Sequence, residues 1–276
     1  MALSEECTAW ESRVAGAIGS PALLAVAFSG GVDSSVLLAL ALRHLGTDRV
    51  VAILGVSDSL GSDERASALQ VASTLGARTV ELPTREIEDP AYRANGPDRC
   101  FHCKSTLFSQ IWEELVSAYG IDAVAYGENA DDALRPDRPG ARAAIDHHVL
   151  RPLAEAGLTK AMVRRLAHEL GLSVADKPAA PCLASRIPHF EEVTPEKLAQ
   201  IDAAEQGVRA LGFSDVRVRH HGDIARIEVP VDELPHAVEV RHRLVSAVRR
   251  AGFRCATLDL AGIQSGAFTL SAVHHE

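Results

Sequence analysis

Apolar residues occur in short runs that alternate with helical patterns through the first two-thirds of the chain. These runs lack the strict apolar–polar alternation of a half-exposed strand, which favours a parallel sheet covered on both faces. We expect its strands over residues 23–28, 50–56, 78–82, 123–126 and 149–153. The helical patterns predict helices over residues 34–45, 62–75, 104–119 and 160–170, each followed by a capping glycine. The fold class is therefore α/β, with a doubly wound parallel sheet.

A different pattern begins near residue 176. Residues 176–188 (DKPAAPCLASRIP) contain three prolines and predict a linker. The elements expected beyond it are a helix over 195–211, strands over 216–220 and 224–229, a helix over 234–251 and a strand over 254–260. We therefore predict an α/β domain over residues 1–180. A smaller α+β domain for substrate binding or oligomerisation is expected over residues 181–276.

Composition narrows the class of protein. Of 276 residues, 47% are hydrophobic, so a substantial core can form, and the formal net charge of −9 argues against nucleic acid as a stable partner. The polar N-terminus does not resemble a signal peptide, and no apolar stretch is long enough to span a membrane. We expect a cytoplasmic protein without a membrane partner. Five cysteines without a secretion signal favour packing, metal binding or thiol chemistry over disulfides.

Residues 29–35 read SGGVDSS and link the first expected strand to its helix. Ligands of a parallel sheet bind at the carboxyl ends of the strands, where glycines let the backbone approach a ligand closely. The N–H groups that begin the helix and the serine hydroxyls suit a phosphate or pyrophosphate, and an aspartate there suits Mg²⁺. The alternative is an ordinary capped turn. The candidate residues are Ser29, Gly30, Gly31, Asp33 (also the candidate Mg²⁺ ligand), Ser34 and Ser35.

This stretch resembles the SGGxDS loop of the N-type ATP pyrophosphatases, the PP-loop superfamily. The resemblance implies an adenine nucleotide alpha hydrolase-like fold that cleaves ATP between its α and β phosphates and adenylylates a substrate. Residues 126–132 (YGENADD) follow another expected strand, so they lie at the same edge of the sheet. Asn129 and Asp132 are candidates there for binding ATP or Mg²⁺, and an Asx-rich turn is the alternative.

Four stretches together resemble the LarE-type sulfurtransferases over nearly the whole chain. They are residues 98–104 (DRCFHCK), 126–132, 177–188 (KPAAPCLASRIP) and 216–228 (VRVRHHGDIARIE). The resemblance implies ATP-dependent conversion of the carboxylates of a small-molecule nucleotide, pyridinium-3,5-biscarboxylic acid mononucleotide, into thiocarboxylates. The product is a precursor of the nickel-pincer nucleotide cofactor.

Cys100 and Cys103 form a C-x-x-C pair that suits a redox pair, half of a zinc site or part of an iron–sulfur site. Cys182, in the linker, is a third candidate. The resemblance implies either that the three thiolates hold a [4Fe–4S] cluster whose open iron carries sulfide, or that Cys182 gives up its own sulfur. The presence of all three cysteines favours the cluster. Arg99 and Lys104 flank the pair and are expected to favour thiolates, whereas Cys7 and Cys255 are expected to be packing residues.

Arginines near the linker are candidates for binding the substrate phosphate. Ser185 and Arg186 follow Cys182, and Arg217 and Arg219 alternate along one expected strand. A guanidinium binds phosphate through two parallel hydrogen bonds. The resemblance implies that this region binds phosphate with help from neighbouring subunits, hence a homo-oligomer. A surface arginine or a solvated basic strand edge is the alternative reading.

Other activities use the same ATP chemistry. A tRNA thiolation enzyme, a PP-loop amidotransferase or ligase, and an inactive nucleotide-binding module are the alternatives. The acidic balance of the chain, and the absence of a basic stretch interleaved with aromatic residues, argue against tRNA.

Overall fold

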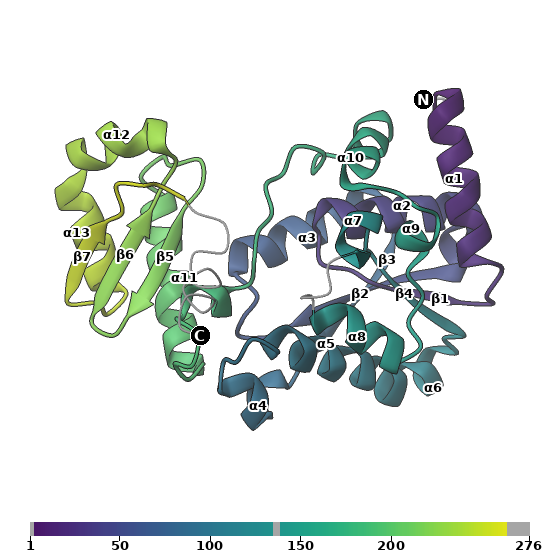
Figure 1. Cartoon of the computed structure of the whole chain (residues 1–276), viewed down its shortest axis with the longest axis horizontal. Coiled ribbons are helices and arrows are strands. Elements are labelled where there is room, and N and C mark those ends of the chain that lie inside the picture. Colours follow the sequence, from purple (N-terminus) through teal and green to yellow (C-terminus); the bar gives the residue numbers. More distant parts are fainter. Residues whose placement is uncertain (1–2, 135–138, 264–276) are drawn as a thin grey trace. The chain divides into compact units, whose positions relative to one another are not determined.

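The computed structural model describes residues 3–134 and 139–263, which form two compact units (Figure 1). The first unit comprises residues 3–57, 64–86, 100–134 and 139–180. The second comprises residues 58–63, 87–99 and 181–263. The sequence-based division assigns 58–63 and 87–99 to the first domain, but both segments pack in the second unit. Where the domains end stays a prediction.

A four-stranded parallel sheet forms the centre of the first unit. Its strands are β1 (Leu24–Ala27), β2 (Val50–Val56), β3 (Arg78–Pro83) and β4 (Ala123–Tyr126). Their order in the sheet is β3-β2-β1-β4, and every neighbouring pair is parallel. The first four expected strands and the doubly wound α/β class are thereby confirmed.

The direction of winding reverses beside β1. The chain runs from β1 to β2 and β3 on one side, and then returns to place β4 on the other side of β1. Such a reversal opens a crevice at the carboxyl ends of the two strands that flank it, and ligands of doubly wound sheets bind there. We therefore expect the ligand-binding residues to lie in the loops that follow β1 and β4.

Helices cover both faces of this sheet (Figure 1). On one face lie α5 (Arg99–Gln110) and α8 (Pro139–Asp146), with a π-helical turn, η3 (Ile111–Leu115), that leads into α6 (Val116–Tyr119). The helices of the other layer are α1 (Glu5–Ile18), α2 (Val32–Leu45), α3 (Ser62–Thr74), α7 (Ala130–Ala133), α9 (Pro152–Glu155) and α10 (Lys160–Glu169). Two short 3₁₀ turns, η1 (Thr47–Arg49) and η2 (Glu86–Glu88), complete the connections.

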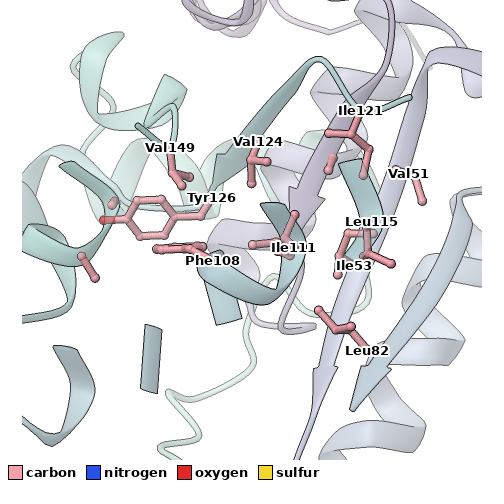
Figure 2. Packing of buried hydrophobic residues seen from close by; sticks show 14 residues of the cluster. Val51, Ile53, Leu82, Phe108, Ile111, Leu115, Ile121, Val124, Tyr126 and Val149 are labelled. Carbon is pink, nitrogen blue, oxygen red and sulfur yellow. The ribbon is translucent and has the colours of Figure 1, made fainter. Parts of the chain in front are cut away.

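An apolar core joins the sheet to α5, η3 and α8 (Figure 2). Phe108 and Ile111 are almost fully buried against Val51 and Ile53 of β2 and Val124 of β4. Burying one such side chain contributes about 1.5–3 kcal/mol to stability. This packing stabilises the sheet and thereby holds in place the strands from which the loops at its carboxyl edge extend.

The second unit contains a three-stranded sheet covered by helices. Its elements are α4 (Pro90–Arg93), η4 (Leu183–Arg186), α11 (Pro195–Arg209), β5 (Arg217–His221), β6 (Ile224–Glu228), η5 (Val231–Glu233), α12 (Leu234–Glu239), α13 (Arg241–Arg250) and β7 (Cys255–Leu258). β5 and β6 are antiparallel, and β6 and β7 are parallel. Because side chains alternate across a strand, Val218 and Ile227 pack in the apolar core while Arg217 and Arg219 project from the other face.

Two expected elements are wrong. Residues 149–153 form only one bridge, between Leu150 and Ala125, before α9 begins at Pro152. Proline has no N–H to continue a strand ladder and suits the first turn of a helix, which accounts for the difference. The helix expected over 234–251 is two helices separated at Val240. No helix in the described part of the chain is long and apolar enough to cross a bilayer.

Candidate active site

The turn after β1 has the backbone shape of an anion-binding loop. Gly30 has a φ of +71°, a conformation that favours glycine. A Cβ at this position would also lie 2.6 Å from the Cβ of Ala68, so a larger residue would clash. Gly31 is the N-cap of α2 and offers no side-chain cap to its first N–H groups. These donors are consequently left for a ligand at the positive end of the helix dipole.

Two of the three serines shape this turn. Ser34 Oγ accepts a hydrogen bond from Ser29 N at 3.3 Å, lies 3.2 Å from Ser29 Oγ and donates to Gly31 O at 3.1 Å. Ser35 Oγ is fully buried and has no hydrogen-bond partner among the described residues. The hydroxyls of Ser29 and Ser34 therefore hold the loop closed, which the sequence analysis does not anticipate.

The loop after β4 meets the start of α2. A Cβ on Gly127 would lie 2.7 Å from Ser34 N, so only glycine permits this approach. Asn129 Nδ2 lies 3.5 Å from Asp33 Oδ1 and donates to Asp132 Oδ2 at 2.8 Å. Asn129 Oδ1 also accepts from Asp132 N, which makes Asn129 the N-cap of α7. The candidates of the two loops thus lie together.

Lys160 completes this group of side chains. Its Nζ donates to Asp33 Oδ2 at 2.6 Å, and its backbone N–H donates to Asp131 Oδ2 at 2.8 Å. Lys160 is the first residue of α10, and Thr159 is the N-cap of that helix. The sequence analysis misses Lys160 because 127 residues separate it from Asp33. We call residues 29–35, 127–132 and Lys160 the β1–β4 edge.

A second group of contacts surrounds Cys182. Its side chain is exposed, while Arg186 Nη1 donates to Pro181 O at 2.7 Å and to Cys182 O at 3.4 Å. Arg186 itself is buried, and its Nε and Nη2 donate to the two carboxylate oxygens of Glu205 at 2.8 and 3.3 Å. We call residues 181–186 the Cys182 turn.

Comparisons with known proteins decide the family. The family model described as asparagine synthase matches residues 14–100, which include the turn after β1. An uncharacterized protein of Synechocystis is 42% identical over 87% of this chain and 90% of its own length. The pyridinium-3,5-bisthiocarboxylic acid mononucleotide synthase of Lactiplantibacillus plantarum is 36% identical over 87% of each chain. The chain belongs to the LarE-type ATP-dependent sulfurtransferases. A tRNA-specific 2-thiouridylase of Methylobacterium nodulans is 33% identical over 55% of this chain.

In this LarE-type chain the C-x-x-C pair lies on one helix. Cys100 is exposed and Cys103 half-buried, three residues apart in α5 and therefore on the same side of it. Cys100 and Cys103 belong to the first unit and Cys182 to the second. Within residues 3–134 and 139–263, no three His, Cys, Asp or Glu side chains are assembled as a metal site. The three-cysteine cluster stays a prediction.

The residues that flank the C-x-x-C pair have other contacts. Lys104 Nζ lies 4.4 Å from the centre of the Tyr126 ring, and Arg99 Nη1 donates to Asn95 Oδ1 and to Ala184 O. Burial, and then the neighbouring Glu128 carboxylate, raise the pKa of Tyr126, so its hydroxyl stays neutral. That Arg99 and Lys104 favour the thiolates stays a prediction.

The other two cysteines behave differently from each other. Cys7 is fully buried in α1, as expected of a packing residue, and burial raises its thiol pKa. Cys255 is exposed in β7, so its expected packing role is wrong. The reason is that side chains alternate across β7, so that Ala256 and Leu258 pack against the core and Cys255 lies on the opposite face.

The arginines expected to bind phosphate are all buried. Arg219 Nε and Nη2 each lie 2.9 Å from a different carboxylate oxygen of Glu228, and Arg219 Nη1 donates to Ser185 O at 3.0 Å. Ser185 Oγ accepts from Arg186 Nη1 at 3.0 Å. Burial, and then repulsion from Arg186, lower the pKa of Arg217. The guanidiniums of Arg186 and Arg219 are thus engaged by carboxylates, and the surroundings of Arg217 disfavour its positive charge.

Proposed function

We propose that this chain activates a carboxylate of pyridinium-3,5-biscarboxylic acid mononucleotide with ATP and replaces the activated oxygen by sulfur. The observation that carries the proposal is the β1–β4 edge, where the open N-terminus of α2 meets Asp33, Asn129, Asp132 and Lys160. This arrangement supplies hydrogen-bond donors for phosphates and carboxylates for a cation. The relative in Lactiplantibacillus plantarum, named for the bisthiocarboxylic product, supports the choice of substrate.

The first step is adenylylation. A substrate carboxylate oxygen attacks the α-phosphorus of ATP, the bond to the β-phosphate breaks, and pyrophosphate leaves as an acyl-adenylate forms. Ser29, Gly30, Gly31, Ser34 and Ser35 provide the turn whose N–H groups receive the pyrophosphate. Lys160 stabilises the negative charge that develops on it. A carboxylate oxygen is a poor leaving group, and this step converts it into part of AMP.

Asp33 and Asp132 fit a Mg²⁺ ion that accompanies the nucleotide. Both carboxylates belong to one hydrogen-bonded group with Asn129, and the ammonium of Lys160 forms an ion pair with Asp33. Oxygen ligands of this kind are those that Mg²⁺ prefers. When bound, the ion supplies charge stabilisation to the phosphates. Lys160 is expected to turn from Asp33 toward the phosphates when ATP binds.

The second step transfers sulfur. A sulfur nucleophile attacks the acyl carbon, and AMP leaves. If the nucleophile is the Cys182 thiolate, a thioester forms; loss of the Cα proton and cleavage of the Cβ–S bond then leave a thiocarboxylate and a dehydroalanine. The exposed side chain of Cys182 supports its access to substrate.

The donor set also fits a [4Fe–4S] cluster held by Cys100, Cys103 and Cys182. Two of these thiols lie three residues apart on one side of α5, which suits two ligands of one cluster. Such a cluster would supply sulfide for the transfer, and Cys182 would then be a ligand that survives turnover. We favour this route because the chain carries all three thiols.

Anaerobic purification followed by iron analysis and intact mass after one turnover separates the two routes. Iron with an unchanged protein mass supports the cluster. A protein that lacks iron and has lost H₂S from Cys182 supports the sacrificial route. Pyrophosphate release that does not depend on the pyridinium substrate contradicts the proposed function.

For the substrate phosphate we propose Arg217. Burial and repulsion from Arg186 lower the pKa of Arg217, and a phosphate beside its guanidinium would offset both effects. Arg217→Lys is expected to raise the KM for the pyridinium substrate and leave the KM for ATP unchanged. An equal rise in both values would contradict this assignment.

One observation favours tRNA as a second candidate substrate. Residues 241–254 comprise α13 and the turn that follows it, and they contain no acidic residue. Their exposed arginines, which the sequence-based predictions do not include, are Arg241, Arg243, Arg249, Arg250 and Arg254. Together with the 2-thiouridylase relative, this surface supports a test of tRNA binding. Affinity that falls steeply with salt, and that falls again when Arg249 and Arg250 are replaced by Gln, would favour tRNA. Salt-insensitive or undetectable binding would exclude it.

A further inference from the structure

Buried guanidiniums from three separate parts of the second unit hold the backbone of the Cys182 turn. Arg186 donates to the carbonyls of Pro181 and Cys182, Arg99 to that of Ala184 at 3.0 Å, and Arg219 to that of Ser185. The remaining residue, Leu183, donates its N–H to Ser59 O at 2.9 Å. Every residue from 181 to 185 is thus fixed through its backbone, while the Cys182 side chain is exposed.

The arginines are themselves fixed in the protein interior. Arg99, Arg186 and Arg219 are 8%, 6% and 3% exposed. Burying a guanidinium is costly unless its hydrogen-bonding groups are satisfied and its charge is offset. Glu205 and Glu228 provide this for Arg186 and Arg219 through paired contacts. Despite burial, the Glu205 carboxylate keeps the pKa of Arg186 above its ordinary value.

Asn95 connects Arg99 to the far side of the turn. Its Oδ1 accepts from Arg99, and its Nδ2 donates to Pro188 O at 2.7 Å and to Ile187 O at 3.3 Å. Asn95 is fully buried and has a φ of +56°, a left-handed conformation that asparagine tolerates better than most residues. Segment 87–99 therefore packs with the linker, although it lies between two parts of the α/β unit in sequence.

We propose that Arg99, Arg186 and Arg219 are positioning residues, which hold the Cys182 turn so that its thiol is placed for sulfur transfer, either as the nucleophile or as a cluster ligand. The inference rests on the proposed role of Cys182 in sulfur transfer. It gives Arg186 and Arg219 a different task from the phosphate binding that the sequence suggests. Loss of one anchor leaves adenylylation intact, because ATP is bound by residues of the other unit, and impairs the sulfur step.

Arg99→Met tests this most cleanly, because Arg99 lies outside both the β1–β4 edge and the phosphate candidates. The full-length variant is assayed in a single turnover for pyrophosphate and for thiocarboxylate. We expect pyrophosphate release within twofold of the unaltered protein. Thiocarboxylate formation should fall by about 100-fold, as a misplacement near 1 Å produces. Arg99→Lys keeps the positive charge but not the planar guanidinium, so its rate of thiocarboxylate formation should lie between those of Arg99→Met and the unaltered protein. Arg13→Met, at an exposed arginine outside every proposed site, is the matched control and should change neither rate.

An activity-independent readout uses a nitroxide attached to Cys182, with Cys100, Cys103 and Cys255 replaced by serine. Its electron paramagnetic resonance spectrum should show slow motion when Arg99 is present and faster motion in Arg99→Met and Arg99→Lys. Unchanged label motion and unchanged thiocarboxylate formation would overturn the inference. An equal fall of both half-reactions would also overturn it, because that result indicates a general loss of structure.

Cys182→Ala distinguishes failure of this inference from failure of the proposed function. If that variant still makes thiocarboxylate at the normal rate, the proposed role of Cys182 is wrong, whatever Arg99→Met does. If Cys182→Ala is inactive in sulfur transfer and Arg99→Met is normal, only the positioning role is wrong.

Discussion

The β1–β4 edge of the first unit and the Cys182 turn of the second are built in different ways. At the β1–β4 edge, local backbone geometry forms most of the site, since Gly30, Gly31 and Ser34 shape one seven-residue turn. At the Cys182 turn, buried side chains that are distant in sequence hold an otherwise irregular segment. The first region is therefore expected to be sensitive to loss of a charge or a glycine, and the second to loss of a buried ion pair.

Asp33→Asn gives the largest expected effect and concerns the β1–β4 edge. It removes the charge that Lys160 neutralises and that a magnesium ion would use, so pyrophosphate release should fall about 100- to 1,000-fold. The measurement is pyrophosphate release in the presence of the pyridinium substrate. Asp48→Asn, at an exposed aspartate, is the control. Full activity of Asp33→Asn would show that the edge does not bind the phosphates as proposed.

Glu228→Ala tests the contrasting dependence of the Cys182 turn on buried ion pairs. The variant leaves the buried guanidinium of Arg219 without this carboxylate, which typically costs about 3–5 kcal/mol. Urea unfolding, followed by the fluorescence of a label on the second unit, provides the free energy. Asp223→Ala breaks the exposed pair with Arg254 in the same unit and should cost less than ~1 kcal/mol. Equal losses of unfolding free energy in the two variants would show that the buried ion pair is no more important to stability than the exposed one.

Gly127→Ala measures how closely the two loops of the β1–β4 edge must approach each other. Its added Cβ would meet Ser34 N at 2.7 Å and push the start of α2 away. We expect the KM for ATP to rise about tenfold, equivalent to ~1.4 kcal/mol. Gly16→Ala serves as a control, because no atom lies within 4 Å of the position of its Cβ. An unchanged KM for ATP in Gly127→Ala would mean that this approach does not matter for binding.

The smallest effect is expected at Glu169, a half-buried carboxylate at the end of α10 that belongs to neither region. Hydrogen bonds from the backbone N–H and then the hydroxyl of Ser4 lower the pKa of Glu169 from 4.5 to about 2. Because the folded pKa is the lower one, Glu169 stabilises the protein above about pH 4.5, and this contribution is lost as the pH falls toward 2. We measure the free energy of unfolding in urea at pH 6 and at pH 3. The decrease between the two pH values should be smaller for Glu169→Gln than for the unaltered protein. An identical difference would show that these bonds do not contribute.

The sequence predicts the β1–β4 edge better than the Cys182 turn for a physical reason. The turn after β1 is specified by neighbouring residues, so Gly30, Gly31 and Asp33 could be recognised directly. Lys160 could not, because only the fold brings it to Asp33. The strand expected over 149–153 does not form because Pro152, which has no N–H for a strand ladder, begins a helix within the apolar run.

At the Cys182 turn, residue type alone misleads. An arginine that binds phosphate and one that anchors a backbone carbonyl have the same sequence signature, and only the partners Glu205, Glu228 and Ala184 separate them. The helix of Arg99 was predicted to begin five residues later, so the link from Arg99 to the linker was hidden. Long-range buried contacts are the part of this protein that pattern and motif cannot supply.

The most direct test of the central claim, that activation and sulfur transfer depend on different regions, is a single-turnover assay of Cys182→Ala that follows pyrophosphate and thiocarboxylate together. We expect pyrophosphate release near the normal rate and no thiocarboxylate. Normal thiocarboxylate formation by this variant, or loss of pyrophosphate release along with it, would contradict the account.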